Sequence, residues 1–342
     1  MNNNQLGFAI IGCGAISNFH AKAIKNIENA NLVCVYDYSF PFAQKFANEY
    51  NCTAVESVEE ILLRKDVDVV CICTPSGLHA KYAIQVANAK KHIVIEKPMA
   101  ITKEQLDKVI AAVQQNNVKV AVITQLRFTP AIQKIKKAVE EGRLGKIFTA
   151  DYRMKYYRSP EYYSSSNWRG TWAMDGGGAL MNQAIHGIDL IQYIMGGIKS
   201  VYADCRTLAR DIEVEDTANI LVEYSNGAIG VIEATTISEP AYPRIIEITG
   251  TNGTIVLKED VIERWDVKGE EGQIDTTETS SVGAGANPMS ITETYHQLQI
   301  ENLIDSIINN KIPLVDENEG RKPVDIILAA YMSNELNKKM II

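Results

Sequence analysis

The first 125 residues alternate short, almost wholly apolar runs with longer amphipathic segments. The apolar runs predict strands at 7–12, 31–37, 67–75, 92–97 and 118–125. Between them lie helical patterns that begin near Ser17, His79 and Thr102 or run through Phe46. Strands that are apolar throughout and separated by helices are typical of a parallel sheet covered on both faces. We therefore predict a doubly wound α/β domain over residues 1–125.

The pattern changes after residue 125 and indicates a second domain over residues 126–342. Apolar and polar positions now alternate with a period of two in segments 145–157, 199–209, 217–225 and 230–238. The tripeptides SNG at 225–227 and TNG at 251–253 are strong hairpin signals. This part of the chain therefore predicts a mostly antiparallel sheet with one buried face.

Two amphipathic helices are predicted near the end, with apolar faces formed by Ile300, Leu303, Ile304 and Ile307 and by Val324, Ile327, Leu328 and Tyr331. Pro323 is expected in the first turn of the second helix. We expect the C-terminal helix to pack back on the first domain. Residues 268–288 lack periodicity and are rich in Gly, Ser, Thr and Glu, which predicts a loop.

Composition and charge narrow the class of protein. The chain has 342 residues, 46% of them hydrophobic, and a net charge of −8, so it has no excess of Lys and Arg to neutralise nucleic acid or an anionic membrane. The segment MNNNQLGFAIIGCG has no basic region and too short an apolar run for a signal peptide or a membrane span. The six cysteines form no C-x-x-C pair. We expect a cytoplasmic protein with free cysteines and a small-molecule ligand.

The turn GCGAIS at 12–17 follows a predicted buried strand and opens a predicted helix, which is the context of a dinucleotide-binding turn. Gly12 permits the tight turn and Gly14 lets the backbone approach the pyrophosphate, while Ser17 takes the third glycine position, where a small residue suffices. Asp37 ends the second strand, where a carboxylate binds ribose hydroxyls and repels a 2′-phosphate. The predicted cofactor is therefore NAD rather than NADP. Its predicted contacts in the turn are Gly12, Gly14, Ala15 and Ile16.

Two further segments, CTPSGLH at 73–79 and IEKPMA at 95–100, follow the carboxyl ends of predicted strands, where open α/β sheets bind ligands. Pro98 restricts Lys97 to an extended conformation, so the lysine side chain is expected to enter the ligand crevice. The predicted cofactor contacts here are Thr74, Pro75, His79, Glu96 and Lys97.

These motifs, together with RFTPA, EEGRLGKI, WRGTW, DGGGALMNQAIHGIDLIQYIMG and IEVEDT, resemble the Gfo/Idh/MocA oxidoreductase family over nearly the whole chain. The resemblance implies a Rossmann domain followed by an α/β domain with a large open antiparallel sheet, which often forms homodimers or homotetramers. It implies hydride transfer between a nicotinamide cofactor and a hydroxyl-bearing carbon of a sugar, cyclitol or nucleotide sugar. The lysine of the family's E-K-P motif corresponds to Lys97, and the histidine of its glycine-rich helix corresponds to His186.

The chain departs from many relatives at Asn182, where they carry Asp. An amide cannot take a proton, so a carboxylate relay at this position is absent. The NQ before the histidine and the upstream WRGTW resemble the branch that oxidises the 3-hydroxyl of UDP-N-acetylglucosaminuronate. Helical spacing places Asn182, His186 and Asp189 on one face.

The expected mechanism assigns three catalytic residues. His186 removes a hydroxyl proton, Lys97 stabilises the negative charge on the oxygen or shuttles the proton, and Asn182 orients the substrate. The candidate substrate contacts are Arg127, Tyr157, Trp168, Arg169 and Asn182.

Other functions remain open at this stage. An aldose or inositol dehydrogenase of the same family is one alternative, and a non-catalytic, NAD-binding regulatory protein is another. No metal site is expected, because the five histidines, at positions 20, 79, 92, 186 and 296, are scattered without metal-ligand spacing.

Overall fold

The computed structural model describes residues 5–270 and 293–342, which divide into two compact units. One unit contains residues 5–125 and 293–321, and the other contains residues 126–270 and 322–342. Residues 293–321 thus pack with the first unit, although the sequence boundary assigned them to the second domain. Most of the predicted loop, residues 271–288, lies outside the described residues.

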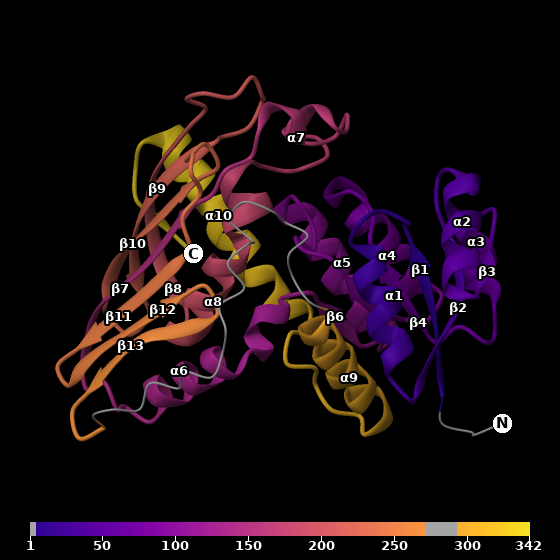
Figure 1. Ribbon diagram of the computed structural model, residues 1–342, viewed down its shortest axis with the longest axis horizontal. Coiled ribbons are helices and arrows are strands. Elements are labelled where there is room, and N and C mark those ends of the chain that lie inside the picture. The colour runs from indigo at the N-terminus through magenta and orange to yellow at the C-terminus, as the bar shows by residue number, and fades with distance from the viewer. Residues whose placement is uncertain (1–4, 271–292) are drawn as a thin grey trace. The chain divides into compact units, whose positions relative to one another are not determined.

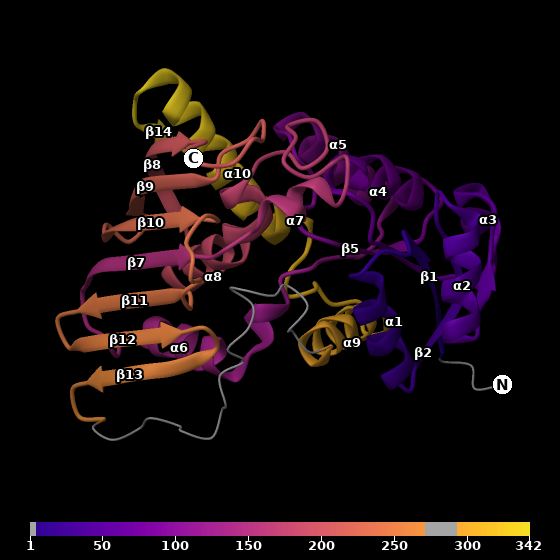
Figure 2. The same ribbon diagram turned by 45° about the horizontal axis from the view of Figure 1, so that its top comes forward.

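The first unit is built on a six-stranded, wholly parallel sheet with the order β3-β2-β1-β4-β5-β6 (Figures 1 and 2). Its strands are β1 (Leu6–Ile11), β2 (Ala30–Tyr36), β3 (Thr53–Ala54), β4 (Val69–Ile72), β5 (His92–Ile95) and β6 (Val120–Val122). The strands β1 and β4 lie at the centre and are buried almost throughout, as their apolar sequences require. The predicted doubly wound α/β fold is confirmed.

The helices of this unit are α1 (Ser17–Asn26), α2 (Phe40–Tyr50), α3 (Val58–Leu63), α4 (His79–Asn88), α5 (Lys103–Asn116) and α9 (Thr294–Ile308). The apolar face of α9 packs against α1 and contributes Ile300, Leu303 and Ile304 to the core of the unit. The hydrophobic pattern does not reveal β3 and α3, because runs of two and six residues are too short to show a period.

The second unit holds an eight-stranded sheet with the order β13-β12-β11-β7-β10-β9-β8-β14 (Figure 2). Its strands are β7 (Ile147–Lys155), β8 (Ile198–Arg206), β9 (Thr217–Tyr224), β10 (Ile229–Thr235), β11 (Ile245–Gly250), β12 (Gly253–Lys258), β13 (Val261–Val267) and β14 (Met340–Ile341). Only the pair of β7 and β10 is parallel, so the predicted antiparallel character is confirmed for the described strands. The two predicted turns join β9 to β10 and β11 to β12 in antiparallel pairs.

Helical segments of the second unit are α6 (Pro130–Glu140), α7 (Pro160–Ser164), the π-helical segment η3 (Ala179–Ala184) and α8 (Ile185–Met195). The helix α8 packs on β7, where Gly187 allows contact with the Tyr152 ring: a Cβ atom at Gly187 would lie 2.0 Å from the ring. Among the described residues, no helix is both long and apolar enough to cross a membrane.

The last helix, α10 (Glu317–Leu336), corrects one prediction. Pro323 lies inside the helix rather than in its first turn. The helix begins earlier because the Asp316 carboxylate accepts the backbone N–H groups of Asn318 at 3.0 Å and Glu319 at 2.8 Å. Such side-chain capping is worth about 1 kcal/mol, and Asp316 is the local signal that the sequence analysis overlooked.

Candidate active site

The glycine turn follows β1 in the first unit. Gly12 has φ +97°, and a Cβ atom there would lie 2.7 Å from the Cys73 carbonyl oxygen, so the position requires glycine. A Cβ atom at Gly14 would meet no atom within 4 Å, which leaves the backbone open to a ligand. Ile16, at the N-cap of α1, makes no side-chain capping bond, so no such bond competes with an anion for the first-turn N–H groups.

Asp37 lies directly after β2 and binds this turn. Its Oδ2 accepts the Cys13 N–H at 2.8 Å, and its Oδ1 accepts the Ser39 N–H at 2.9 Å. Each carboxylate oxygen can accept a second hydrogen bond, as a ribose hydroxyl requires. The open Gly14 backbone, the helix start and Asp37 together fit NAD, and the residues following Asp37 supply no Arg or Lys for a 2′-phosphate.

His79 joins the two segments that follow β4 and β5. Its Nδ1 lies 2.7 Å from the Pro98 carbonyl oxygen and its Nε2 lies 2.8 Å from the Thr74 carbonyl oxygen. Burial lowers the pKa of His79, although the two carbonyl groups act in the opposite direction. Because the ring is only 1% exposed and both nitrogens face backbone, His79 holds the turns in place rather than offering a free polar atom to NAD.

Glu96 is also buried and held by protein groups. Its Oε1 lies 2.8 Å from His20 Nε2, and its Oε2 accepts the backbone N–H of Lys97 at 3.3 Å. His296 Nε2 lies 3.8 Å from the same Oε1. Burial raises the pKa of Glu96, but the two imidazoles outweigh this effect and hold the pKa well below its usual range. The carboxylate is therefore ionised and anchors the segment that carries the half-buried Lys97.

The cluster of His20, Glu96 and His296 corrects the expectation that the histidines are scattered. The parallel sheet brings α1 to β5, and α9 packs on α1, so residues from both ends of the chain meet. Two imidazoles and a carboxylate form a donor set that a transition metal ion accepts. However, ligands about 2.1 Å from a tetrahedral ion lie about 3.4 Å apart. The separation of 2.8 Å between His20 and Glu96 is that of a direct hydrogen bond.

In the second unit, Asn182 and His186 lie on consecutive elements rather than on one α-helix. Asn182 belongs to η3, and His186 lies in the first turn of α8. The expected single helical face is therefore wrong for residues 179–184, because a π-helix has more residues in each turn. Short π-helical segments are frequent at functional sites. Both side chains are half-buried.

The Asn182 amide is held at both ends. Its Nδ2 donates to Asp175 Oδ1 at 2.5 Å, and its Oδ1 accepts Gln183 Nε2 at 2.7 Å. Asp175 is buried and its other oxygen accepts the Gly170 N–H at 3.0 Å. A carboxylate thus lies beside the amide, and sequence analysis missed it because it is seven positions upstream of Asn182.

Arg127 does not have the exposure that a substrate contact requires. Its side chain is fully buried and forms a two-point ion pair with Asp189, from Nε to Oδ2 at 2.8 Å and from Nη2 to Oδ1 at 2.6 Å. The guanidinium also lies 4.4 Å from the centre of the Tyr193 ring. We therefore correct the prediction for Arg127: it joins η2 (Gln125–Phe128) to α8, and Asp189 faces the protein interior.

The other candidate substrate contacts lie in a cluster of arginines and aromatic rings. The Arg169 guanidinium lies 4.4 Å from the Tyr162 ring centre and 5.2 Å from that of Trp168. Tyr157 lies beneath the guanidinium of Arg210 at 5.3 Å. Arg158, which was not among the predicted contacts, also belongs to this cluster, and its Nη2 donates to Gln183 Oε1 at 2.8 Å. Through Gln183, the cluster is linked to Asn182.

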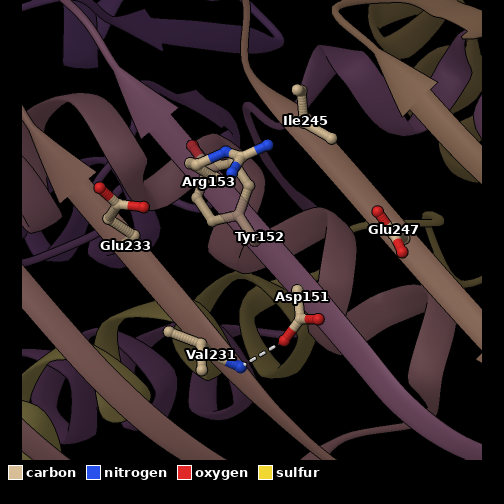
Figure 3. A pocket seen from close by; sticks show the side chains of 7 residues that line it. All are labelled: Asp151, Tyr152, Arg153, Val231, Glu233, Ile245 and Glu247. Carbon is tan, nitrogen blue, oxygen red and sulfur yellow. Dashed lines mark hydrogen bonds between the residues drawn. The ribbon is translucent and has the colours of Figure 1, made fainter.

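A hollow of about 270 Å³ lies on the second unit's sheet, across β7, β10 and β11. Figure 3 shows its charged side chains, Asp151, Arg153, Glu233 and Glu247, and the bond from the Val231 N–H to Asp151 at 2.7 Å. It is lined by none of the predicted site residues and holds no imidazole or lysine. We assign it no catalytic role.

The doubly wound sheet, the glycine turn and the acid after β2 define a protein of the NAD-binding class. Family models agree in both units: "Oxidoreductase family, NAD-binding Rossmann fold" matches residues 6–124, and "GFO/IDH/MocA C-terminal domain" matches residues 132–256. The chain belongs to the GFO/IDH/MocA family of oxidoreductases.

Similar proteins include both uncharacterised and characterised dehydrogenases. The chain is 30% identical over 256 residues to the uncharacterised oxidoreductase YrbE of Bacillus subtilis, covering 73% of each protein. It is 28% identical over 275 residues to myo-inositol 2-dehydrogenase of Thermotoga maritima, covering 77% of this chain and 79% of the relative. Among solved structures, WlbA dehydrogenase of Bordetella pertussis in complex with NADH and UDP-GlcNAcA has a TM-score of 0.89 and 31% identity, covering 100% of this chain and 99% of that one.

Proposed function

We propose that the protein uses NAD to oxidise a nucleotide sugar, and that its substrate is UDP-N-acetylglucosaminuronate, oxidised at the 3-hydroxyl. The observation that carries this proposal is the similarity over the whole chain to two WlbA dehydrogenases that bind NADH and UDP-GlcNAcA, from Bordetella pertussis and Chromobacterium violaceum, at 31% and 30% identity. The arginine and aromatic cluster around Tyr162 supports it, because such side chains suit an anionic sugar nucleotide.

The proposed chemistry uses three residues of this chain. NAD, when bound, supplies the hydride acceptor. His186 removes the hydroxyl proton, a role for which an imidazole is suited because its ordinary pKa is about 6.5. Lys97 donates a hydrogen bond to the same oxygen and stabilises its negative charge. Asn182, fixed by Asp175, orients the substrate and cannot compete for the proton.

A direct test follows NADH absorbance with UDP-N-acetylglucosaminuronate, myo-inositol, levoglucosan and glucose as substrates. We expect the highest kcat/KM for the UDP-sugar. Turnover of myo-inositol or levoglucosan, without turnover of the UDP-sugar, would instead favour an activity like that of the inositol or levoglucosan dehydrogenases among the relatives.

The residue assignments have their own test. His186→Ala and Lys97→Ala should each lower kcat by about 10²-fold or more, since general acid–base catalysis contributes that much. Lys108→Ala is the matched control, because Lys108 is exposed and pairs with the exposed Glu104. A His186→Ala variant with parental kcat would refute the base assignment.

We also propose that the protein forms homodimers or homotetramers through the open face of the second unit's sheet. Tyr202, Leu221 and Val231 are exposed and lie side by side on β8, β9 and β10. Exposed apolar rows of this kind typically mark an interface. Light scattering should show an oligomer that Leu221→Lys dissociates; a wild-type monomer would contradict the proposal.

A further inference from the structure

Glu215 accepts three consecutive backbone N–H groups at the start of the segment that carries Asn182. The Gly178 N–H donates to Glu215 Oε2 at 2.9 Å, and the Leu180 N–H donates to Oε1 at 2.8 Å. Between them, the Ala179 N–H donates to the backbone carbonyl of Glu215 at 2.9 Å. Glu215 lies in the connection from β8 to β9, so a side chain of the sheet region holds the first turn of η3.

The glycines before η3 are explained by this contact. A Cβ atom at Gly178 would lie 1.8 Å from the Glu215 carbonyl oxygen. Gly177 has φ +155°, and a Cβ atom there would lie 2.1 Å from the Tyr331 hydroxyl oxygen. Tyr331, on α10, donates to Glu215 Oε1 at 2.9 Å. The glycines therefore let the backbone approach Glu215 and Tyr331 within the same unit.

Glu215 is a buried acid that depends on these donors. Burial raises its pKa to about 7, while the N–H groups of Leu180 and Gly178 and the Tyr331 hydroxyl oppose the rise. Among the described residues, the titratable groups that face it are Tyr331 on α10 and Cys205 on β8, and neither is a cation. In this part of the chain, hydrogen bonds hold the Glu215 carboxyl group.

We propose that Glu215 is a positioning residue for catalysis: by binding residues 178–180, it sets where η3 begins and therefore where Asn182 and His186 lie. The Asn182 N–H donates to the Gly178 carbonyl at 3.0 Å, so a shift of Gly178 would also move Asn182. This inference rests on the proposed function, in which His186 is the base. A displacement of about 1 Å in a reacting group can cost 10²-fold in rate.

The experiment compares Glu215→Gln with Asp216→Asn. Asp216 is a matched control because it is also buried and accepts backbone N–H groups, but those of Leu208, Ala209 and Arg210. Hydrogen exchange at residues 178–182 measures the contact, and kcat and KM with NAD and UDP-N-acetylglucosaminuronate measure its effect on turnover. Tyr331→Phe, which removes one hydrogen bond and keeps the carboxylate, serves if Glu215→Gln does not fold.

We expect Glu215→Gln to speed exchange at residues 178–182 and to lower kcat by about 10-fold to 10²-fold, with Tyr331→Phe less affected. The KM for NAD should not change, because the NAD-binding residues lie in the other unit. In Asp216→Asn, exchange should rise at residues 208–210 instead, and kcat should fall less than in Glu215→Gln.

Several results would overturn the inference. Unchanged exchange at 178–182 in Glu215→Gln would show that the contact does not hold the segment. Equal losses of kcat in Glu215→Gln and Asp216→Asn would indicate general destabilisation. Parental kcat in Glu215→Gln, with His186→Ala inactive, would refute the positioning role and leave the proposed function intact. An active His186→Ala would refute the proposed function first, and the inference with it.

Discussion

The buried pair of Arg127 and Asp189 supports a quantitative prediction about stability. The two side chains are 0% and 1% exposed and share hydrogen bonds of 2.8 and 2.6 Å. Arg127→Met keeps most of the side-chain volume but leaves the Asp189 charge buried without its partner. Breaking such a pair costs about 3–5 kcal/mol, and losing the contact with the Tyr193 ring adds about 1 kcal/mol.

The measurement is the free energy of unfolding from urea titration at pH 7, for the wild type, Arg127→Met and the double variant Arg127→Met/Asp189→Asn. The double variant removes the unpaired Asp189 charge, so we expect its free energy of unfolding to be about 2 kcal/mol higher than that of Arg127→Met. Both variants should keep the wild-type KM for the sugar substrate, because the guanidinium is fully buried.

Two results would refute this reasoning. A loss below about 1 kcal/mol in Arg127→Met would show that the ion pair does not support the fold. A KM for the sugar raised about tenfold in both variants, with stability near wild type, would show that Arg127 binds substrate, as first predicted from the sequence.

Three further predictions concern other buried carboxylates. Asn182→Asp should lower the free energy of unfolding by about 2 kcal/mol in thermal unfolding, because it places two carboxylates at hydrogen-bond distance. Adding Asp175→Asn to this variant should recover the lost stability, whereas an Asn182→Asp variant as stable as wild type would contradict the pairing. Burial raises the pKa of Glu215 from its ordinary 4.5 to about 7, so the folded protein binds a proton that the unfolded chain releases in this pH window. The wild-type free energy of unfolding should therefore fall by up to about 3 kcal/mol relative to Glu215→Gln as pH rises from 4.5 to 7. Urea titrations that show a constant difference between the two proteins would refute this. His20→Leu should cost about 3 kcal/mol at pH 7, because it leaves the buried Glu96 carboxylate without its 2.8 Å partner. The folded pKa of Glu96 lies well below the ordinary 4.5, so the cost should shrink as pH falls below 4.5, and a cost independent of pH would contradict this bond.

Much of the fold could be read from local patterns. The strand at 7–12, the turn at 12–17 and Asp37 carry their signals within a few residues, because strand burial and turn geometry depend on neighbouring side chains. The structure places these elements where the pattern predicted them, with β1 at Leu6–Ile11 and α1 beginning at Ser17. The two hairpin turns were readable for the same reason.

The candidate site was less accessible from the sequence. From the sequence, Arg127 was predicted to contact the substrate. Its partner Asp189 lies 62 residues away, and no residue near Arg127 in the chain indicates that pairing. The segment around Asn182 read as an ordinary α-helix, because a π-helix has no distinctive period over six residues.

The sequence by itself determined the parallel sheet, the NAD-binding turn and the presence of Lys97 and His186, because each rests on short-range pattern or on residue chemistry. The tertiary structure alone decided which polar groups bind one another inside the protein and are therefore not free to bind a ligand. His20 reaches Glu96 across 76 residues, and Gly178 reaches Glu215 across 37. Buried polar groups must find partners wherever the fold brings them, so contacts of this range depend on how strands and helices pack and not on local sequence.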